Sequence, residues 1–195
     1  MPLIMKKLSL GENMRKIVCL WGGPGTGKST TAAGVFNILK KKDFNCEMNR
    51  EYIKDWVWEG RTINEGDQVY ITAKHLKKEA ALIRKGVEFI ITDSPAALTS
   101  FYGDLYDKYE RQFGACKQIV KQHHQLCKDH GYKIDHFFLI RTKAYQPEGR
   151  YQDEATARQY DIDIKKFLDD YGIRYEFIKC DEHVEENIVN KLLNQ

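Results

Sequence analysis

Short apolar runs recur along the chain and predict five β-strands. Residues 16–21 and 87–92 are dominated by apolar side chains, as expected for parallel strands that are buried on both faces. Each run is followed by glycine or by a polar turn. The predicted strands are residues 16–21, 45–49, 87–92, 136–141 and 174–180.

Between these runs, apolar residues recur every three or four positions, which is typical of helices with one buried face. One such series ends at Gly86, a suitable helix stop. Segments 100–108 and 142–152 show no clear period and are expected to be irregular. The predicted helices are 29–40, about 51–57, 67–86, 109–131, 157–172 and a last one from about 182. The alternation predicts a three-layer α/β fold with a five-stranded parallel sheet.

Length and composition indicate one folded domain. The chain has 195 residues, of which 42% are hydrophobic and 30% charged, and this excludes disordered and collagen-like classes. The net charge is +3, from 31 basic and 28 acidic residues. Such a small excess does not indicate a polyanion-binding surface, so a nucleic-acid partner is compatible with the charge but not implied by it.

Cysteine usage and hydropathy suggest a reducing, cytoplasmic setting. The five cysteines form no CxxC pair and are odd in number, which argues against a disulfide framework or a zinc ribbon. No run of about 18 apolar residues predicts a membrane span. We expect residues 1–14 to be an extension that can fray, and residues 15–195 to form the domain.

The clearest motif is GGPGTGKS at residues 22–29, which fits the Walker A pattern GxxxxGK(S/T) and lies between a predicted strand and a predicted helix. Successive amides in such a loop curl around phosphate oxygens, and side chains would block their approach. Lys28 would neutralise the β- and γ-phosphates, and Ser29 would hold Mg²⁺ at the helix N-terminus. The motif predicts ATP and Mg²⁺ as cofactors, bound by Gly23, Gly25, Thr26, Gly27, Lys28, Ser29 and Thr30.

With this motif and element order, the chain resembles small P-loop kinases of the nucleoside and nucleotide monophosphate kinase type. It is similar to deoxynucleoside kinases, to nicotinamide riboside kinase-like domains and to nucleotide kinase-like proteins often encoded by phages. The resemblance covers nearly the whole chain in element order, but only the Walker A motif is highly specific. It implies phosphoryl transfer to a small acceptor.

The same resemblance gives Glu51 a role. Deoxynucleoside kinases carry a glutamate after the second strand, with a tryptophan five residues later, and Glu51 and Trp56 match that spacing. There the carboxylate accepts the proton of the attacking hydroxyl. The proline normally beside the glutamate is Tyr52 here. The alternative is an exposed glutamate in a first helical turn.

Asp93 ends an apolar strand, in the sequence IITDSP. An acid there can bind Mg²⁺ through water, as a Walker B acid does, or orient the acceptor hydroxyl. The relatives usually place arginine directly after this acid, and Ser94 departs from that pattern. An Asp-Ser-Pro helix cap is the alternative.

Segment 142–152 occupies the place of the lid in nucleotide kinases, a loop that closes over the phosphates. Phosphoryl transfer requires positioned cations, so Arg141, Arg150 and Arg158 are the candidates, with Lys143 as a helper. The alternative is a solvated basic loop.

Other polar residues carry weaker signals. Gln68 and Tyr70 could contact a base in an acceptor pocket, although helices of any function carry such residues. His123 and Cys127 lie four apart on one helix face but lack a second ligand pair, so core packing is favoured over metal binding. The lysine runs at 40–42 and 77–78 need no partner.

These features predict an ATP-dependent phosphotransferase acting on a small nucleoside, nucleotide or related cofactor. Two alternatives stay open. A polynucleotide or DNA-base kinase would need a basic trough beside the acceptor pocket. A partner-activated P-loop ATPase or switch would turn over ATP without an acceptor. The sequence leaves the acceptor, ATP against GTP, the choice of Glu51 or Asp93 as base, and the oligomeric state undecided, with a homodimer as one candidate.

Overall fold

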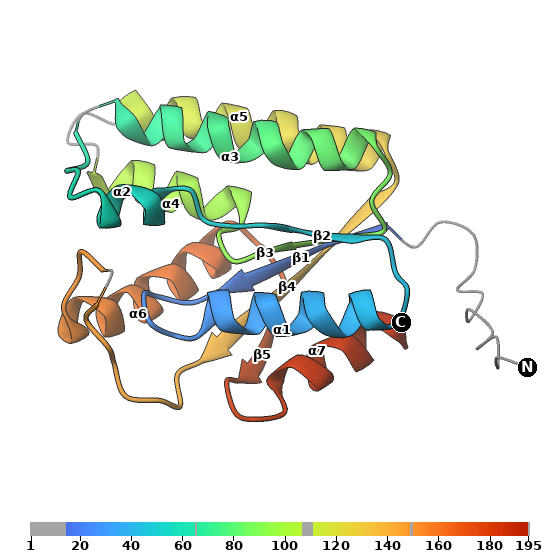
Figure 1. The fold of residues 1–195 in the computed structure, drawn as a ribbon. Helices are drawn as coiled ribbons and strands as arrows, with labels where there is room; N and C mark the ends of the chain where they lie inside the picture. Colours follow the sequence, from blue (N-terminus) through green and yellow to red (C-terminus); the bar gives the residue numbers. More distant parts are fainter. Residues whose placement is uncertain (1–14, 65, 107–110, 149, 195) are drawn as a thin grey trace, which may run out of the picture.

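Helices and strands alternate along the chain, as the sequence pattern predicts. The computed structural model describes residues 15–64, 66–106, 111–148 and 150–194, so the predicted extension 1–14 lies outside the described residues. The elements are β1 (Arg15–Trp21), α1 (Lys28–Lys41), β2 (Cys46–Asn49), α2 (Ile53–Trp58), α3 (Asp67–Arg84), β3 (Phe89–Thr92), α4 (Ala96–Tyr106), α5 (Arg111–Asp129), β4 (Tyr132–Ile140), α6 (Glu154–Asp170), β5 (Glu176–Lys179) and α7 (Val184–Leu193) (Figure 1).

The five strands form one parallel sheet in the order β2-β3-β1-β4-β5. The most apolar predicted strand, β1, lies at its centre, where Ile17 pairs with Ile90 on one side and with Ile134 on the other. The predicted three-layer fold with a five-stranded parallel sheet is confirmed. None of the described helices is long and apolar enough to cross a bilayer.

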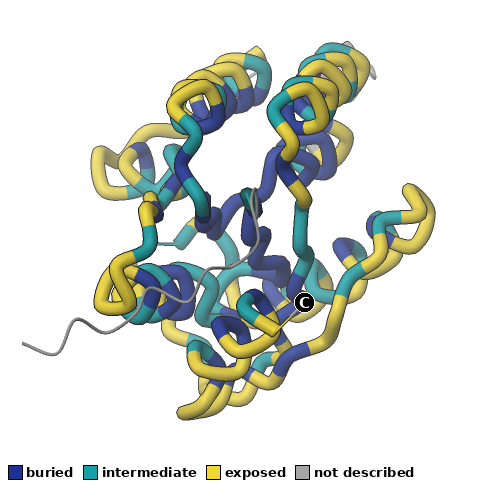
Figure 2. Tube along the Cα trace, turned by 90° about the vertical axis from the view of Figure 1, so that its right-hand side faces the viewer, coloured by how far each residue is buried: buried dark blue, intermediate teal, exposed yellow. Residues whose placement is uncertain are grey.

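Helices cover both faces of the sheet, and alternate residues of β1 point into two cores. Val18 and Leu20 pack with α1 and α7 on one face. Ile17 and Trp21 pack with α3, α4, α5 and α6 on the other. Figure 2 shows buried backbone at the centre of the molecule and exposed backbone on the outward sides of the helices. Alternate side chains of β1 thus pack against the helices on the two faces of the sheet.

Helix α4 corrects one expectation. Residues 100–108 were expected to be irregular because they lack a helical period, yet α4 runs from Ala96 to Tyr106. Its side chains from Ala96 to Phe101 are all buried, since α3, α5 and α6 pack around it. A helix buried on most sides has no polar face, and therefore no periodic contrast in its sequence.

Candidate active site

Three glycines of the loop after β1 adopt backbone conformations that other residues rarely reach. Gly22, Gly25 and Gly27 have φ values of 135°, 78° and 98°. A Cβ on Gly25 would lie 3.0 Å from the Tyr145 ring, and one on Gly27 would lie 2.5 Å from Cys180 Sγ. The loop therefore needs glycine both for its conformation and for its close neighbours.

Lys28, the first residue of α1, lies across this loop. Its Nζ donates hydrogen bonds to the carbonyls of Gly22 at 2.7 Å and Gly23 at 2.9 Å. Burial lowers the pKa of Lys28, whereas the carboxylates of Glu51 and Asp93 counteract that shift. A bound polyanion would favour the charged ammonium further.

Gly23 and Thr26 brace the loop and do not line the cavity. The Gly23 amide donates to Asp161 Oδ1 at 2.6 Å, and Thr26 Oγ1 donates to the Gly23 carbonyl at 3.0 Å. Gly25, Gly27, Lys28, Ser29 and Thr30 do line the cavity. The predicted phosphate-binding set thus divides into residues that face the ligand space and residues that shape the loop.

Arg141, which follows β4, is tied to the same loop by an acid that the sequence analysis did not single out. Its Nη2 donates to Asp161 Oδ2 at 3.0 Å and to the Pro24 carbonyl at 2.9 Å. Asp161 lies on α6 and so holds both Arg141 and the Gly23 amide. No local sequence signal identifies it, because its partners are 20 and 138 positions away.

Tyr145 organises the predicted lid segment. Its ring lies near two guanidinium groups, with centroid distances of 5.9 Å to Arg141 Cζ and 5.2 Å to Arg150 Cζ. Its hydroxyl donates to the Gln152 carbonyl. Among the described residues, Nη1 of Arg141 and Nη1 of Arg150 are buried without a hydrogen-bond partner. Two unsatisfied cationic donors beside the loop fit an anion.

Arg158 lies elsewhere. It is on the exposed side of α6, where its Nη2 pairs with Glu154 Oε1 at 2.7 Å, and it does not line the cavity. Lys143, which was expected to assist, is exposed and also outside the cavity lining. Of the predicted basic side chains, the structure therefore brings Arg141 and Arg150 to the loop.

Two acidic residues lie close together just beyond the ends of β2 and β3. Glu51 follows β2, Asp93 follows β3, and the Glu51 amide donates to Asp93 Oδ1 at 2.8 Å. Asp93 is buried, whereas Glu51 lines the cavity. Burial raises the pKa of Glu51, and Asp93 raises it further, while Lys28 acts in the opposite direction. The raised pKa moves Glu51 toward the range of a general base.

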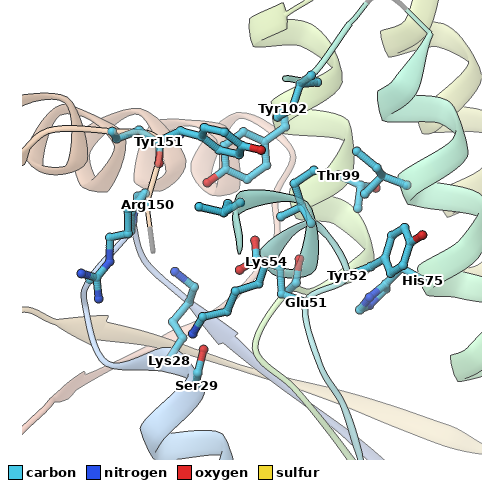
Figure 3. A pocket seen from close by; sticks show the side chains of 18 of the residues that line it. Lys28, Ser29, Glu51, Tyr52, Lys54, His75, Thr99, Tyr102, Arg150 and Tyr151 are labelled. Carbon is cyan, nitrogen blue, oxygen red and sulfur yellow. The ribbon is translucent and has the colours of Figure 1, made fainter. Parts of the chain in front are cut away.

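One cavity joins the phosphate-binding loop to Glu51 and to an aromatic end. Figure 3 shows Lys28 and Ser29 on one side, Glu51 in the middle, and Tyr102 and Tyr151 above them. The space measures about 1160 Å³, including the part open to solvent. A nucleotide and a small acceptor can share a space of this size.

The far end of the cavity is suited to a planar group. Its lining combines rings with apolar side chains and three other polar side chains; the members are Tyr52, Ile53, Val57, Ile63, Gln68, Ile71, His75, Thr99, Tyr102, Tyr151 and Gln152. Gln68 lines it as expected, with Nε2 donating to the Thr99 carbonyl at 3.3 Å. Tyr70 does not line it, and instead stacks on Trp56 with centroids 6.4 Å apart.

A buried polar network lies directly behind the carboxylates. Glu79 of α3 is 1% exposed, accepts from His123 Nε2 at 2.7 Å and from Asn49 Nδ2 at 3.0 Å, and lies 3.7 Å from His75 Nε2. His75 Nε2 is also 3.0 Å from Asn49 Nδ2 and 3.5 Å from Thr92 Oγ1. Asn49 and Thr92 end the two strands that carry Glu51 and Asp93.

The donor set at the loop suits magnesium. Ser29 at the start of α1 offers a hydroxyl oxygen to the cavity, and Mg²⁺ in proteins is commonly held by one or two oxygen ligands together with phosphates. Asp93 is buried outside the cavity lining, so its carboxylate would act on the ion through water. The described part of the chain contains no cluster of three or more His, Cys, Asp or Glu residues able to hold a metal. His123 pairs with Glu79, which agrees with core packing rather than metal binding.

Comparison with known families now identifies the type of domain. The family model described as AAA domain matches residues 17–186. The chain belongs to this family. Its loop and sheet confirm the predicted P-loop fold. A comparison with curated proteins gave no significant match.

Solved structures resemble the chain in fold. The NadR protein in complex with NR matches with a TM-score of 0.63 and 15% identity, over 93% of this chain and 52% of that one. NadR in complex with NAD and AMP-PNP matches with a TM-score of 0.57 and 14% identity, over 91% of this chain and 48% of that one. The chain therefore spans about half the length of these proteins. Deoxyadenosine kinase from M. mycoides, with products dCMP and a flexible dCDP bound, matches with a TM-score of 0.52 and 14% identity. The match covers 92% of this chain and 100% of that one.

Proposed function

We propose that the protein transfers the γ-phosphoryl group of ATP to a hydroxyl of a small nucleoside-type acceptor. The observation that carries the proposal is that Lys28, Ser29 and Glu51 line one cavity. Kinases and nucleotide-bound proteins among the structural neighbours support it through the shared fold.

On the donor side, the loop amides, Lys28 and the two lid arginines would hold the triphosphate. Lys28 exchanges its contacts with the Gly22 and Gly23 carbonyls for phosphate oxygens. Arg141 and Arg150 supply the unsatisfied Nη1 donors. Mg²⁺ held by Ser29 and Asp93 would neutralise charge on the phosphates.

On the acceptor side, the oxygen of the acceptor hydroxyl bonds to the γ-phosphorus, and Glu51 accepts the proton that this hydroxyl loses. The bond from that phosphorus to the bridging oxygen breaks, and ADP leaves with the electron pair. Asp93 accepts a hydrogen bond from the Glu51 amide and so positions the base. Arg158 pairs with Glu154 outside the cavity, so the proposal gives it no phosphate contact.

Transfer from radiolabelled ATP to a panel of nucleosides, nucleotides and nicotinamide riboside tests this assignment. We expect Mg²⁺-dependent transfer to at least one acceptor and a loss of about 100-fold or more in kcat for Lys28→Ala. Glu51→Gln should lose a comparable factor and retain ATP binding, because it removes the base and leaves the donor site intact.

The rival hypothesis of a partner-driven ATPase makes a different prediction. ATP turnover that needs no acceptor and rises only with a protein partner would contradict the proposed function. The absence of affinity for any nucleoside triphosphate would contradict both hypotheses.

A further inference from the structure

A second groove adjoins the main cavity on its far side. It lies between the segment after β2 and helix α3, and Glu51, Tyr52 and His75 line both spaces. A ligand whose hydroxyl reaches Glu51 can therefore extend past Tyr52 into this groove. The groove is a direct continuation of the acceptor site.

Cations dominate the groove. Arg50, Lys74, Lys77 and Lys78 line it, against two carboxylates, Glu51 and Asp55. Arg50, Lys77 and Lys78 are exposed and form no ion pair with any described residue. The groove thus presents unneutralised positive charge beside the acceptor site.

The charge continues along α3 in a row. Lys74, Lys77, Lys78 and Arg84 are spaced so that they follow one side of the helix, over about 15 Å at 1.5 Å per residue. The acids of α3 are Asp67 in its first turn and Glu79, which is buried. The exposed side from Lys74 to Arg84 is therefore basic throughout, which the net charge of +3 conceals.

Tyr52 lines the groove, Tyr70 contacts the groove residue Lys74, and Trp58 lies on the same helix as Asp55. Tyr70 is 50% exposed and Trp58 69% exposed. Trp58 lies one turn beyond the groove residue Asp55 on α2. The Lys74 ammonium lies 4.4 Å from the Tyr52 ring centroid and 5.7 Å from that of Tyr70. Cations together with accessible rings are the combination that binds single-stranded nucleic acid, through phosphate contacts and base stacking.

We propose that the site also phosphorylates a terminal nucleoside of a single-stranded nucleic acid, whose phosphodiester chain follows this basic groove. The inference rests on the proposed function and extends its acceptor from a free nucleoside to a strand. A row about 15 Å long extends well beyond the reach of one phosphate group, so a mononucleotide would occupy only one end of it, whereas a strand can place further phosphates along it. The terminal hydroxyl oxygen bonds to the γ-phosphorus, its proton passes to Glu51, and ADP leaves.

The test measures binding and transfer separately. Binding of a fluorescein-labelled 12-residue oligo-dT is followed by anisotropy between 50 and 200 mM NaCl, and transfer from ATP is measured with the same oligonucleotide and with a free nucleoside. The groove variant is Lys77→Glu/Lys78→Glu. The matched control is Lys41→Glu/Lys42→Glu, two adjacent exposed lysines at the end of α1, on the opposite face of the sheet.

We expect the groove variant to bind the oligonucleotide at least about tenfold more weakly. The slope of log K for binding against log salt concentration should become shallower by about 1.4, because each of the two lost phosphate contacts removes about 0.7. Its transfer to a free nucleoside should equal that of the wild type, and the control should match the wild type in every assay. Lys28→Ala should bind the strand normally but not phosphorylate it, which separates the groove from the chemistry.

Three results would overturn the inference and leave the proposed function standing. One is transfer to a nucleoside without binding or transfer to the oligonucleotide. Another is a mononucleotide that binds the groove as tightly as the 12-residue strand, which would assign the groove to a small phosphate-bearing acceptor. Strand binding that the groove variant retains unchanged would also overturn it.

Discussion

The ion pair between Glu79 and His123 gives a sharp test of how the site is built. The pair lies behind the strand ends that carry Glu51 and Asp93, with 2.7 Å between Nε2 and Oε1, and its side chains are 1% and 4% exposed. Glu79→Gln keeps the size of the side chain and removes its charge. The imidazolium of His123 then lies in the core without its counter-ion.

The expected cost follows from this burial. Removal of one partner of a buried ion pair lowers the free energy of unfolding by about 3–5 kcal/mol. The glutamine amide oxygen can still accept the hydrogen bond from His123, so we expect the lower end, about 3 kcal/mol. For a chain of this size that corresponds to a fall in Tm of about 6–12 °C. Urea and thermal unfolding, followed by circular dichroism, measure both quantities.

Glu154→Gln is the matched control. Glu154 also lies 2.7 Å from its cation, Arg158, but these side chains are 50% and 60% exposed. Removal of the Glu154 charge should lower the free energy of unfolding by less than about 1 kcal/mol, because water already screens the pair. If Glu79→Gln costs no more than Glu154→Gln, the argument from burial is wrong.

The pH dependence provides a second readout of the same pair. Burial alone would lower the pKa of His123, but its hydrogen bonds to Cys127 and Glu79 and the Glu79 charge raise it to about 10. A folded pKa above the ordinary 6.5 means that the stabilisation is complete below about pH 6.5 and is lost as pH rises toward 10. The stability difference between wild type and Glu79→Gln should therefore shrink over that interval. A stability difference that stays constant between pH 6.5 and 10 would contradict a raised pKa for His123.

Three further substitutions test the phosphate end of the cavity. Gly25→Ala should weaken ATP binding at least about tenfold in calorimetry, because its φ of 78° and its contacts exclude a Cβ. Arg150→Ala should lower kcat about 100-fold, whereas Arg158→Ala should change it by less than about twofold; equal effects would contradict the geometry. Asp161→Asn should lower kcat/KM about tenfold, since it loosens Arg141 and the loop together; an unchanged kcat/KM would argue against this role.

The sheet could be predicted from the sequence because its signals are local. A parallel strand buried on both faces is an apolar run, and a Walker A loop is a contiguous motif, so β1 and the residues after it are encoded within about 15 positions. The same holds for the positions of Glu51 and Asp93, which come two residues and one residue after a strand. Where the signal is contiguous, periodicity and spacing are sufficient.

The features that sequence analysis missed depend on tertiary contacts. Helix α4 lacks a polar face because other helices surround it. Asp161 and Tyr145 acquire their positions only when α6 and the segment after β4 fold against the loop. The lysine run at 77–78 was interpreted as needing no partner, because the sequence does not show that Arg50 and Lys74 line the same groove, and net charge sums over the whole surface.

The buried network explains why the two carboxylates can be held close together. Like charges repel, and for that reason the nearby Asp93 carboxylate adds to the rise in the pKa of Glu51 that burial causes. Asn49 and Thr92 precede them by two and one residues and are fixed from behind through His75 and Glu79. The cost of holding Glu51 beside Asp93 is thus offset by contacts outside the cavity, and a substitution at Glu79 that leaves the protein folded should reduce kcat without touching the substrate.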